Sequence, residues 1–280
     1  MKSENRALPF FLILAAEKGS AEFSRACPRD FRPFILTAFM IYLIPMNSQN
    51  GGIGMRDVKC VFFDIGYTLV DEDDVWTFRC REQAETQEAR RLALSPSQIY
   101  GEIVQASIAY RPQYRTVIRK FGFSNPAPYR HSLEKLYPDT IPVLQSLSAK
   151  YRLGIIANQT EGLCDRLKSW GIFRYFSLVV SSWDYHIMKP DARLFQIAVD
   201  LSGCRPSETA MVGDRLGNDI FPAKALGMKT IWVKQGFGKF QTPKSAAYSP
   251  GIEIGRLSEL LHILYHAYAF CRHFPARRPF

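Results

Sequence analysis

Short apolar runs alternate with helical patterns in the second half of this chain. The runs are rich in β-branched and aromatic side chains, which predicts buried strands at 152–157, 176–181, 209–212 and 229–233. Amphipathic stretches predict helices at 141–150, 161–170, 191–202, 219–226 and 257–268. This alternation predicts an α/β fold with a doubly wound, mainly parallel, Rossmann-like sheet.

An earlier apolar run, residues 58–63, predicts the first strand of the sheet. Only Lys59 interrupts it, and it ends at Asp64, which is followed by a glycine turn. Open α/β sheets bind ligands in the crevice at the carboxyl ends of their strands, so this carboxylate is placed to act as a nucleophile or a metal ligand. Aspartate is also a common turn former, so the chemistry of the other strand ends decides between the two interpretations.

The pattern becomes helical between the first and the second strand. Residues 76–94 are rich in Glu, Gln, Ala and Arg, and residues 97–110 form a second helical stretch. Prolines divide the following residues into short pieces. We predict an all-helical domain inserted into an α/β core. The predicted boundaries are 1–54 for a poorly structured N-terminal extension, 55–71 and 139–268 for the core, 72–138 for the helical domain, and 269–280 for a basic C-terminal tail.

Composition and charge exclude several classes of function. The net charge of the chain is +10, but residues 55–264 carry only 27 basic against 22 acidic residues, without a cluster of basic and aromatic side chains. We therefore predict no nucleic-acid partner. The apolar stretches 8–16 and 34–44 are each too short to span a bilayer, so we predict no membrane anchor. The six cysteines contain no Cys-x-x-Cys pair, which predicts reduced thiols in a cytoplasmic protein and no zinc site.

Three polar motifs follow later strands of the predicted sheet. They are Asn158-Gln159-Thr160, Lys189-Pro190-Asp191, and the run from Gly213-Asp214 to Asn218-Asp219. Together with Asp64, in this order and spacing, they resemble the haloacid dehalogenase (HAD) superfamily of hydrolases, most of whose members are Mg²⁺-dependent phosphatases. The resemblance covers about residues 55–264, and the Gly-Asp-x-x-x-Asn-Asp run is its most specific part. The helical insertion resembles the cap that closes over the active site in many members, and a subdomain that only adds stability is the alternative.

The expected metal site is formed by acidic residues. Mg²⁺ prefers hard oxygen ligands, and Asp64 and Asp214 are predicted to offer two carboxylates from adjacent strand ends. The resemblance implies that the backbone carbonyl of Gly66 is a third ligand and that Asp219 binds the ion or its waters. The alternative interpretation of Asp214 and Asp219 is a helix cap and a first-turn charge that the helix dipole favours.

The expected phosphate site contains Asp64, Lys189, Asn158 and Thr160. Asp64 is predicted to be the nucleophile, which forms an aspartyl phosphate. The charge of Lys189 would keep Asp64 ionised and neutralise the transferred group. Asn158, Thr160 and backbone N–H groups at the next helix start are expected to bind the phosphate of a small phosphorylated metabolite.

Three positions depart from the family pattern. Family phosphatases usually have a second Asp, which acts as a general acid, where this chain has Gly66, and a Ser or Thr where it has Ala157. Tyr67 stands where the family often has Gly. Loss of a general acid typically costs ~10²–10⁴ in rate, so aryl and acyl phosphates would be hydrolysed far better than alkyl phosphates. One of the acidic residues 71–74 is a candidate for supplying the missing proton.

Three functions are consistent with these observations. The first is a HAD-like hydrolase that acts on a small phosphorylated metabolite with Mg²⁺. The second is an inactive or weakly active relative that binds a ligand or regulates another protein, which Gly66 and Ala157 suggest. The third is a metal-independent 2-haloacid dehalogenase. Asp214 and Asp219 count against the third, because extra negative charge does not help a site that binds a carboxylate substrate without metal.

Overall fold

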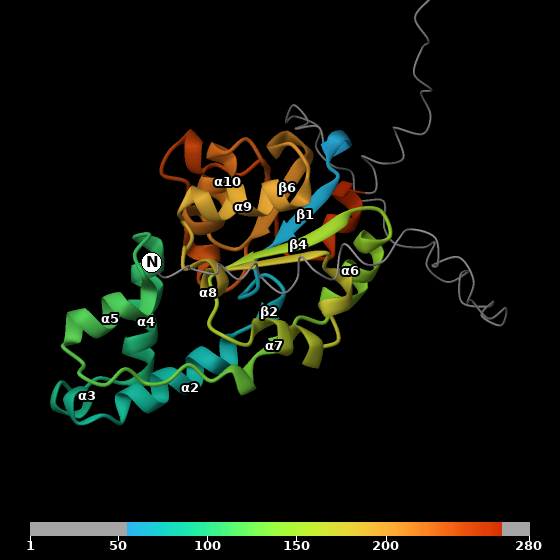
Figure 1. Ribbon diagram of the computed structural model, residues 1–280. Helices are drawn as coiled ribbons and strands as arrows, with labels where there is room; N and C mark the ends of the chain where they lie inside the picture. Colours follow the sequence, from blue (N-terminus) through green and yellow to red (C-terminus); the bar gives the residue numbers. More distant parts are fainter. Residues whose placement is uncertain (1–54, 265–280) are drawn as a thin grey trace, which may run out of the picture. The chain divides into compact units, whose positions relative to one another are not determined.

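The computed structural model describes residues 55–264, and the predictions for the N-terminal extension and the C-terminal tail lie outside these residues. A six-stranded sheet has the order β5-β4-β1-β6-β7-β8, and all neighbouring strands are parallel (Figure 1). The α/β fold predicted from the sequence is therefore confirmed. The strands are β1 (Cys60–Phe63), β4 (Arg152–Ala157), β5 (Leu178–Ser181), β6 (Thr209–Gly213), β7 (Lys229–Val233) and β8 (Ile252–Ile254).

Helices cover both faces of the sheet, as a doubly wound fold requires. Figure 1 shows α9 and α10 on one side of the strands and α7 on the other. One apolar cluster joins the sheet to α6, α7 and residues 257–264, and a second joins it to α9 and α10. The helices are α6 (Thr140–Ser148), α7 (Leu163–Ser169), α8 (Ser182–Tyr185), α9 (Ala192–Ser202) and α10 (Phe221–Ala225).

The central position of β1 follows from its sequence. All four of its residues are buried, because the strand has a neighbour on each side and helices on each face. Phe63 is paired with Ile155 on β4 and with Val212 on β6. Asp64 comes one residue later and donates its backbone N–H to the carbonyl of Val212, at 2.9 Å. The chain therefore changes from strand to turn at Asp64, in the middle of the sheet.

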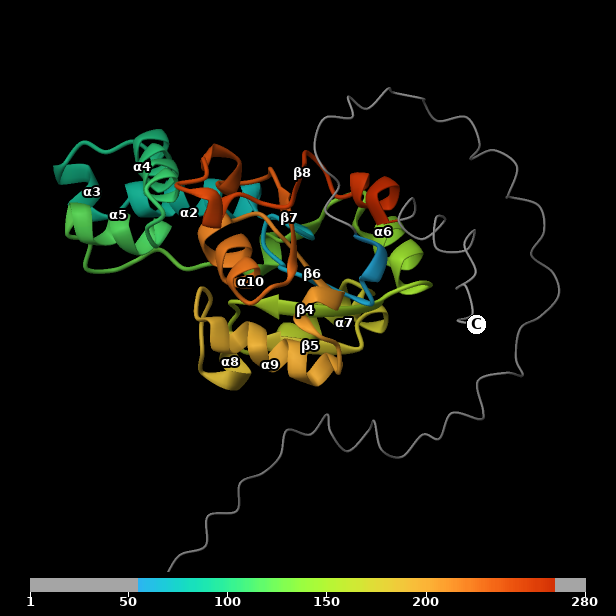
Figure 2. The ribbon, with the colours of Figure 1, turned by 90° about the horizontal axis from the view of Figure 1, so that it is seen from above.

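The chain is mostly helical between β2 (Val70–Asp71) and β3 (Lys135–Leu136), two strands that pair antiparallel. The helices of this segment lie together beside the sheet (Figure 2). The helix predicted at 76–94 is two helices, because Thr86 takes an extended conformation and caps the second with its side chain. The four helices are α2 (Asp73–Ala84), α3 (Gln87–Arg91), α4 (Pro96–Ile108) and α5 (Gln113–Phe121).

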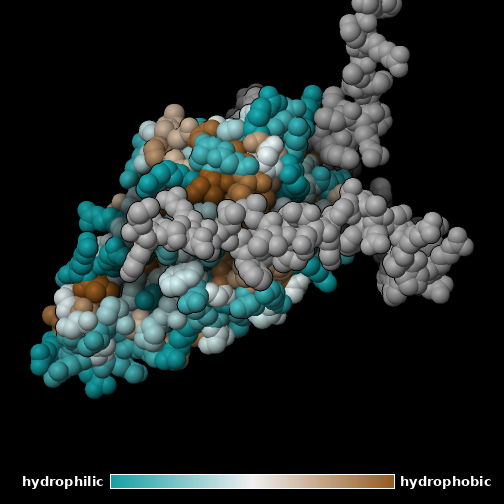
Figure 3. All heavy atoms as spheres, in the orientation of Figure 1, coloured by the Kyte–Doolittle hydropathy of each residue, from teal (hydrophilic) through white to brown (hydrophobic). Residues whose placement is uncertain are grey.

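The helical segment has its own apolar cluster, to which the α/β part adds two aromatic side chains. Trp76 and Ile99 belong to this cluster, and so do Tyr67 and Phe237. The outer surface of α2 and α3 is largely hydrophilic (Figure 3). The two parts therefore share buried apolar surface next to the end of β1.

No helix within residues 55–264 is long and apolar enough to cross a membrane. All four cysteines in these residues are free. They are Cys60, Cys80, Cys164 and Cys204.

Candidate active site

The carboxyl ends of the parallel strands surround a cavity of about 400 Å³. Asp64 follows β1, Asn158 follows β4 and Asp214 follows β6. Lys189 reaches the same place from the loop between α8 and α9. The sequence-predicted residues that line the cavity are Asp64, Gly66, Asn158, Thr160, Lys189 and Asp214.

Lys189 forms the electrostatic centre of this site. Its ammonium group lies 2.7 Å from Asp64 Oδ1 and 2.5 Å from Asp219 Oδ1, and its side chain is only 2 % exposed. Burial alone would lower the pKa of Lys189, but the Asp219 and Asp64 carboxylates outweigh it and raise this pKa above its ordinary value. Lys189 therefore carries a fixed positive charge against the oxygen of Asp64.

A cluster of three carboxylates offers a site for a divalent cation. One oxygen from each of Asp64, Asp214 and Asp219 lies within 4.8 Å of the others. Burial, followed by the charges of Asp219 and Asp64, raises the pKa of Asp214 well above its usual range. Among the described residues, no cation lies within ion-pair distance of Asp214. Hard oxygen ligands that repel one another fit Mg²⁺, which would balance their charge.

Asp219 lies in a π-helical turn, Leu216–Ile220, and not in the α-helix predicted at 219–226. The α-helix α10 begins only at Phe221, and Pro222 in its first turn has no N–H to donate. The side chain of Asp219 accepts a hydrogen bond from the backbone N–H of Arg215, at 3.0 Å. The wider turn directs a completely buried carboxylate toward Lys189.

Asn158 and Thr160 line the cavity, but each already has a protein partner. The amide of Asn158 accepts from the backbone N–H of Lys189 at 2.7 Å and donates to its carbonyl at 3.0 Å. Thr160 Oγ1 lies 3.2 Å from His131 Nε2. Asn158 therefore holds the backbone of Lys189 in place, and its predicted contact with phosphate, like that of Thr160, remains a prediction. Ser182 also lines the cavity, which the sequence did not indicate, and its hydroxyl group donates to the carbonyl of Gln159 at 3.1 Å.

A loop that the sequence marked only by Gly236-Phe237-Gly238 contributes to the site. A Cβ atom on Gly238 would lie 1.9 Å from the carbonyl oxygen of Asp214, so only glycine lets the loop approach this closely. The ring of Phe237 lines the cavity, and its carbonyl accepts a hydrogen bond from Ser107 of α4. The loop thus contacts both Asp214 and the helical segment, which a bare Gly-x-Gly pattern does not predict.

The turn after Asp64 has a left-handed residue that is not glycine. Tyr67 has φ of +53°, a region that costs a side chain about 1–2 kcal/mol. Its ring packs edge-on against Phe237, with centroids 5.4 Å apart, and its hydroxyl donates to Asp73 at 3.0 Å. These contacts offset the backbone strain and explain why this chain can have Tyr67 where the family often has Gly.

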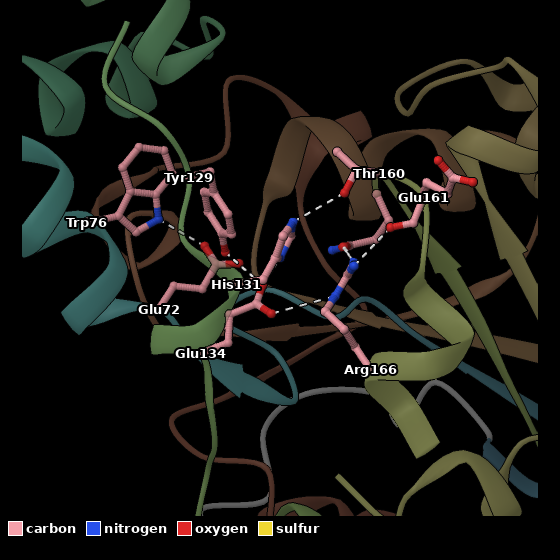
Figure 4. Close-up of polar contacts among 9 residues, drawn as sticks. Glu72, Trp76, Tyr129, His131, Glu134, Thr160, Glu161 and Arg166 are labelled. Carbon is pink, nitrogen blue, oxygen red and sulfur yellow. Dashed lines mark hydrogen bonds and ion pairs between the residues drawn. The ribbon is translucent and has the colours of Figure 1, made fainter. Parts of the chain in front are cut away.

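Glu72 lies at the start of α2 and lines the same cavity. The indole N–H of Trp76 donates to its Oε2 at 2.9 Å, and Tyr129 lies beside it (Figure 4). Burial, and to a smaller extent the charges of Glu134 and Asp64, raise the pKa of Glu72 to about 7, against the hydrogen bonds from Trp76 and Tyr129. Half-buried Glu72 is thus a carboxyl group that is partly protonated near neutral pH.

A polar chain connects the helical segment to the core on the same side of the cavity (Figure 4). Glu134, just before β3, accepts from Tyr129 and lies 3.0 Å from His131 Nδ1. The other ring nitrogen of His131 contacts Thr160, in the loop after β4. The insertion is therefore attached next to the strand end that is expected to hold phosphate.

Comparison with known proteins identifies the family. The chain is 28 % identical over 237 residues to a glyceraldehyde 3-phosphate phosphatase of Methanopyrus kandleri, which covers 74 % of this chain and 97 % of that protein. It is 35 % identical over 129 residues to a phosphoserine phosphatase of Thermus thermophilus, which covers 45 % of this chain and 49 % of that protein. The structure of a HAD phosphatase from Thermococcus onnurineus is similar, with a TM-score of 0.54, 26 % identity, and coverage of 74 % of this chain and 98 % of that one. Residues 61–233 match the model of the haloacid dehalogenase-like hydrolases, and the chain belongs to this family of hydrolases.

Proposed function

We propose that this protein is a Mg²⁺-dependent phosphatase that hydrolyses a small phosphorylated metabolite through a phosphorylated Asp64. The observation that carries the proposal is the position of Lys189, which lies within 2.7 Å of Asp64 and beside the carboxylate cluster. The relatives' names support the substrate class, because both are named as phosphatases of small phosphorylated compounds. A cytoplasmic location stays a prediction from the cysteine pattern.

Asp64 is the proposed nucleophile because its carboxylate lies at the end of β1 and Asp64 lines the cavity. It lies in contact with the ammonium group of Lys189, which also faces the cavity. Attack by Asp64 on phosphorus would bring negative charge onto the phosphate oxygens, and Lys189 would stabilise that charge. The Asn158 amide holds the backbone of Lys189 through two hydrogen bonds and so fixes this geometry.

The proposed Mg²⁺ ligands are Asp64, Asp214, the backbone carbonyl of Gly66, and Asp219 directly or through water. When bound, Mg²⁺ supplies positive charge next to the phosphate oxygens. Lys189 contacts both Asp64 and Asp219, but its single positive charge balances only one carboxylate, and Asp214 has the charges of Asp219 and Asp64 beside it. This charge imbalance supports a cation at the cluster.

We propose that α2 to α5 form a cap over the cavity, with residues 72–138 as the cap domain. Trp76, Gln113 and Tyr129 line the cavity from this segment. They are thus placed to contact the part of the substrate beyond its phosphate, which is where a cap sets substrate choice.

A comparison of substrates with and without metal tests this function. The full chain is assayed against a panel of phosphate monoesters and 2-haloacids, with Mg²⁺ and with EDTA, beside an Asp64→Asn control. Phosphate release that requires both Mg²⁺ and Asp64 is the expected result. Halide release in EDTA would instead identify a dehalogenase, and no turnover of either class would favour a binding or regulatory protein.

A further inference from the structure

The space beside Gly66 is filled by a carboxyl group from another element. A Cβ atom on Gly66 would lie 2.2 Å from Glu72 Oε1 and 2.9 Å from Glu72 Cδ. These separations are far below van der Waals contact, so the two groups compete for the same space. The carboxyl of Glu72 therefore occupies the place that a side chain two residues after the nucleophile would take.

The orientation of this carboxyl group is fixed. Trp76, one turn further along α2, donates its indole N–H to Oε2 at 2.9 Å. Oε1 is then the oxygen nearer to Gly66, since Oε2 would be 3.3 Å from a Cβ there. Glu72 shares the cavity with Asp64 and Lys189. Oε2 is thus held by Trp76, and Oε1 lies on the side of the turn that follows Asp64.

The other acidic residues of the 71–74 run have different roles. Asp71 accepts from the backbone N–H of Asp73 at 2.9 Å, and Asp73 accepts from the Tyr67 hydroxyl. Asp74 is 60 % exposed and pairs with Lys135. Of these four residues, only Glu72 lines the cavity.

We propose that Glu72 is the acid and base of the reaction, and that it replaces the acid absent at Gly66. The proposal rests on the proposed phosphatase function. A catalytic role for Glu72 predicts that its loss lowers the hydrolysis rate to an extent that depends on the leaving group, whereas a structural role does not.

The proton transfers balance over the two steps. Asp64 forms a bond to phosphorus while the bond from phosphorus to the leaving oxygen breaks, and this oxygen takes the proton of Glu72. The products are an alcohol, phosphorylated Asp64 and ionised Glu72. Water then attacks the phosphorus and gives a proton to Glu72, while the bond from phosphorus to Asp64 breaks. Inorganic phosphate leaves, and both carboxyl groups return to their starting forms.

The environment of Glu72 suits a group that exchanges a proton. The hydrogen bond from Trp76 can hold the Glu72 carboxyl in place whether it is ionised or neutral. Both a carboxylate oxygen and the carbonyl oxygen of a neutral carboxyl accept a hydrogen bond from an N–H group.

The structure also predicts the effect of the variant Gly66→Asp. An aspartate at position 66 would supply an acid where family phosphatases usually have one, but its side chain would overlap Glu72. We now expect Gly66→Asp alone to lower activity. An aspartate at position 66 should fit without displacing another carboxyl group when Glu72 is shortened, as in the double variant Gly66→Asp with Glu72→Ala.

The decisive experiment measures kcat/KM for a series of phosphate monoesters of graded leaving-group pKa, with the full chain and Mg²⁺. Glu72→Gln keeps an acceptor for Trp76 but has no acidic proton, and Asp74→Asn on the same helix is the matched control. We expect Glu72→Gln to lose ~10²–10⁴-fold on alkyl esters and little on aryl esters with acidic phenols, because only the poor leaving groups need a proton. Asp74→Asn should behave as the unaltered protein.

Each outcome of this series supports or overturns a separate claim. An equal loss on alkyl and aryl esters in Glu72→Gln, or no loss on either, would overturn the role of Glu72 while the phosphatase function stands. Absence of Mg²⁺-dependent phosphate release from the unaltered protein would overturn the phosphatase function itself and the role of Glu72 with it. Recovery of alkyl-ester hydrolysis in the double variant, relative to Glu72→Ala, would support a shared position for the two acids.

Discussion

Replacement of Lys189 by methionine should destabilise the protein strongly. The change keeps an unbranched side chain of similar length but removes the charge that lies between Asp64 and Asp219. Removal of one partner from a buried ion pair leaves an uncompensated charge and typically costs about 3–5 kcal/mol of unfolding free energy. The side chains of Lys189 and Asp219 are 2 % and 0 % exposed, so solvent screens this interaction little.

Urea unfolding in EDTA measures the effect without a metal ion that would compensate for the lost charge. With a slope of about 2 kcal/mol per molar urea, the midpoint should fall by roughly 1.5–2.5 M. Lys234→Met is the matched control, because Lys234 and Glu253 are 3.5 Å apart and about half exposed, and such pairs contribute roughly 0.2–1 kcal/mol. Equal losses in the two variants would refute the buried charge arrangement.

The pH dependence of this loss gives a second check. Burial raises the pKa of Asp219 and Lys189 lowers it, so the pKa of Asp219 should rise further in Lys189→Met. A carboxyl group whose pKa is higher in the folded than in the unfolded state binds protons more readily in the folded state. The folded state therefore gains stability as the pH falls through the folded-state pKa toward the unfolded pKa of ~3.9. The deficit of the variant should therefore shrink at acid pH, and a constant deficit would contradict the assignment of the lost charge to Asp219.

Three further experiments test other parts of the site. Asp214→Asn and Asp64→Asn should each abolish Mg²⁺ binding in calorimetry, and unchanged Mg²⁺ affinity in both would rule out the metal site. Asp214→Asn should also stabilise the metal-free protein by about 0.5–2 kcal/mol, because it removes repulsion between like charges. Asn158→Ala should lower kcat and cost roughly 1–3 kcal/mol of stability, since two hydrogen bonds to the backbone of Lys189 are lost; full activity would show that they do not position it. Gly238→Ala should lower the thermal midpoint and the Mg²⁺ affinity, because its methyl group would clash with the Asp214 carbonyl. The control Gly101→Ala has open space around it in α4 and should raise stability by about 0.5–1 kcal/mol. Equal effects of the two variants would argue against the close approach of Gly238 to Asp214.

The sequence predicted the parts of the fold that local pattern controls. β4 and β7 have the predicted limits, because each starts at a basic residue, continues as a mainly apolar run and stops before a polar residue, Asn158 or Lys234. α9 begins at a capping Asp191 and ends at Gly203 in a left-handed conformation, as its terminal residues predict. β8 was not predicted, since this strand has only three residues, lies at the edge of the sheet and is partly exposed.

The parts of the site that come from distant contacts were not predictable in this way. Gly238 and Asp214 are far apart in the sequence, and only the folded structure shows that they lie in close contact. The sequence restricted the candidate proton donor to residues 71–74, but only the direction of each side chain distinguishes Glu72 from its neighbours. The π-helical turn at Asp219 depends on its bond to Arg215 and on the tertiary position of Lys189, for which the local pattern carries no signal.

Phosphorylation of Asp64 during turnover is the step on which the proposed function depends. Its most direct test is to quench the full chain during hydrolysis of a good substrate, reduce any acyl phosphate with borohydride, and locate the modified residue by peptide mass spectrometry. We expect homoserine in place of Asp64 when Mg²⁺ and substrate are both present, and unmodified Asp64 when either is left out. Turnover with Asp64 unmodified, or with the label on another residue, would contradict the account.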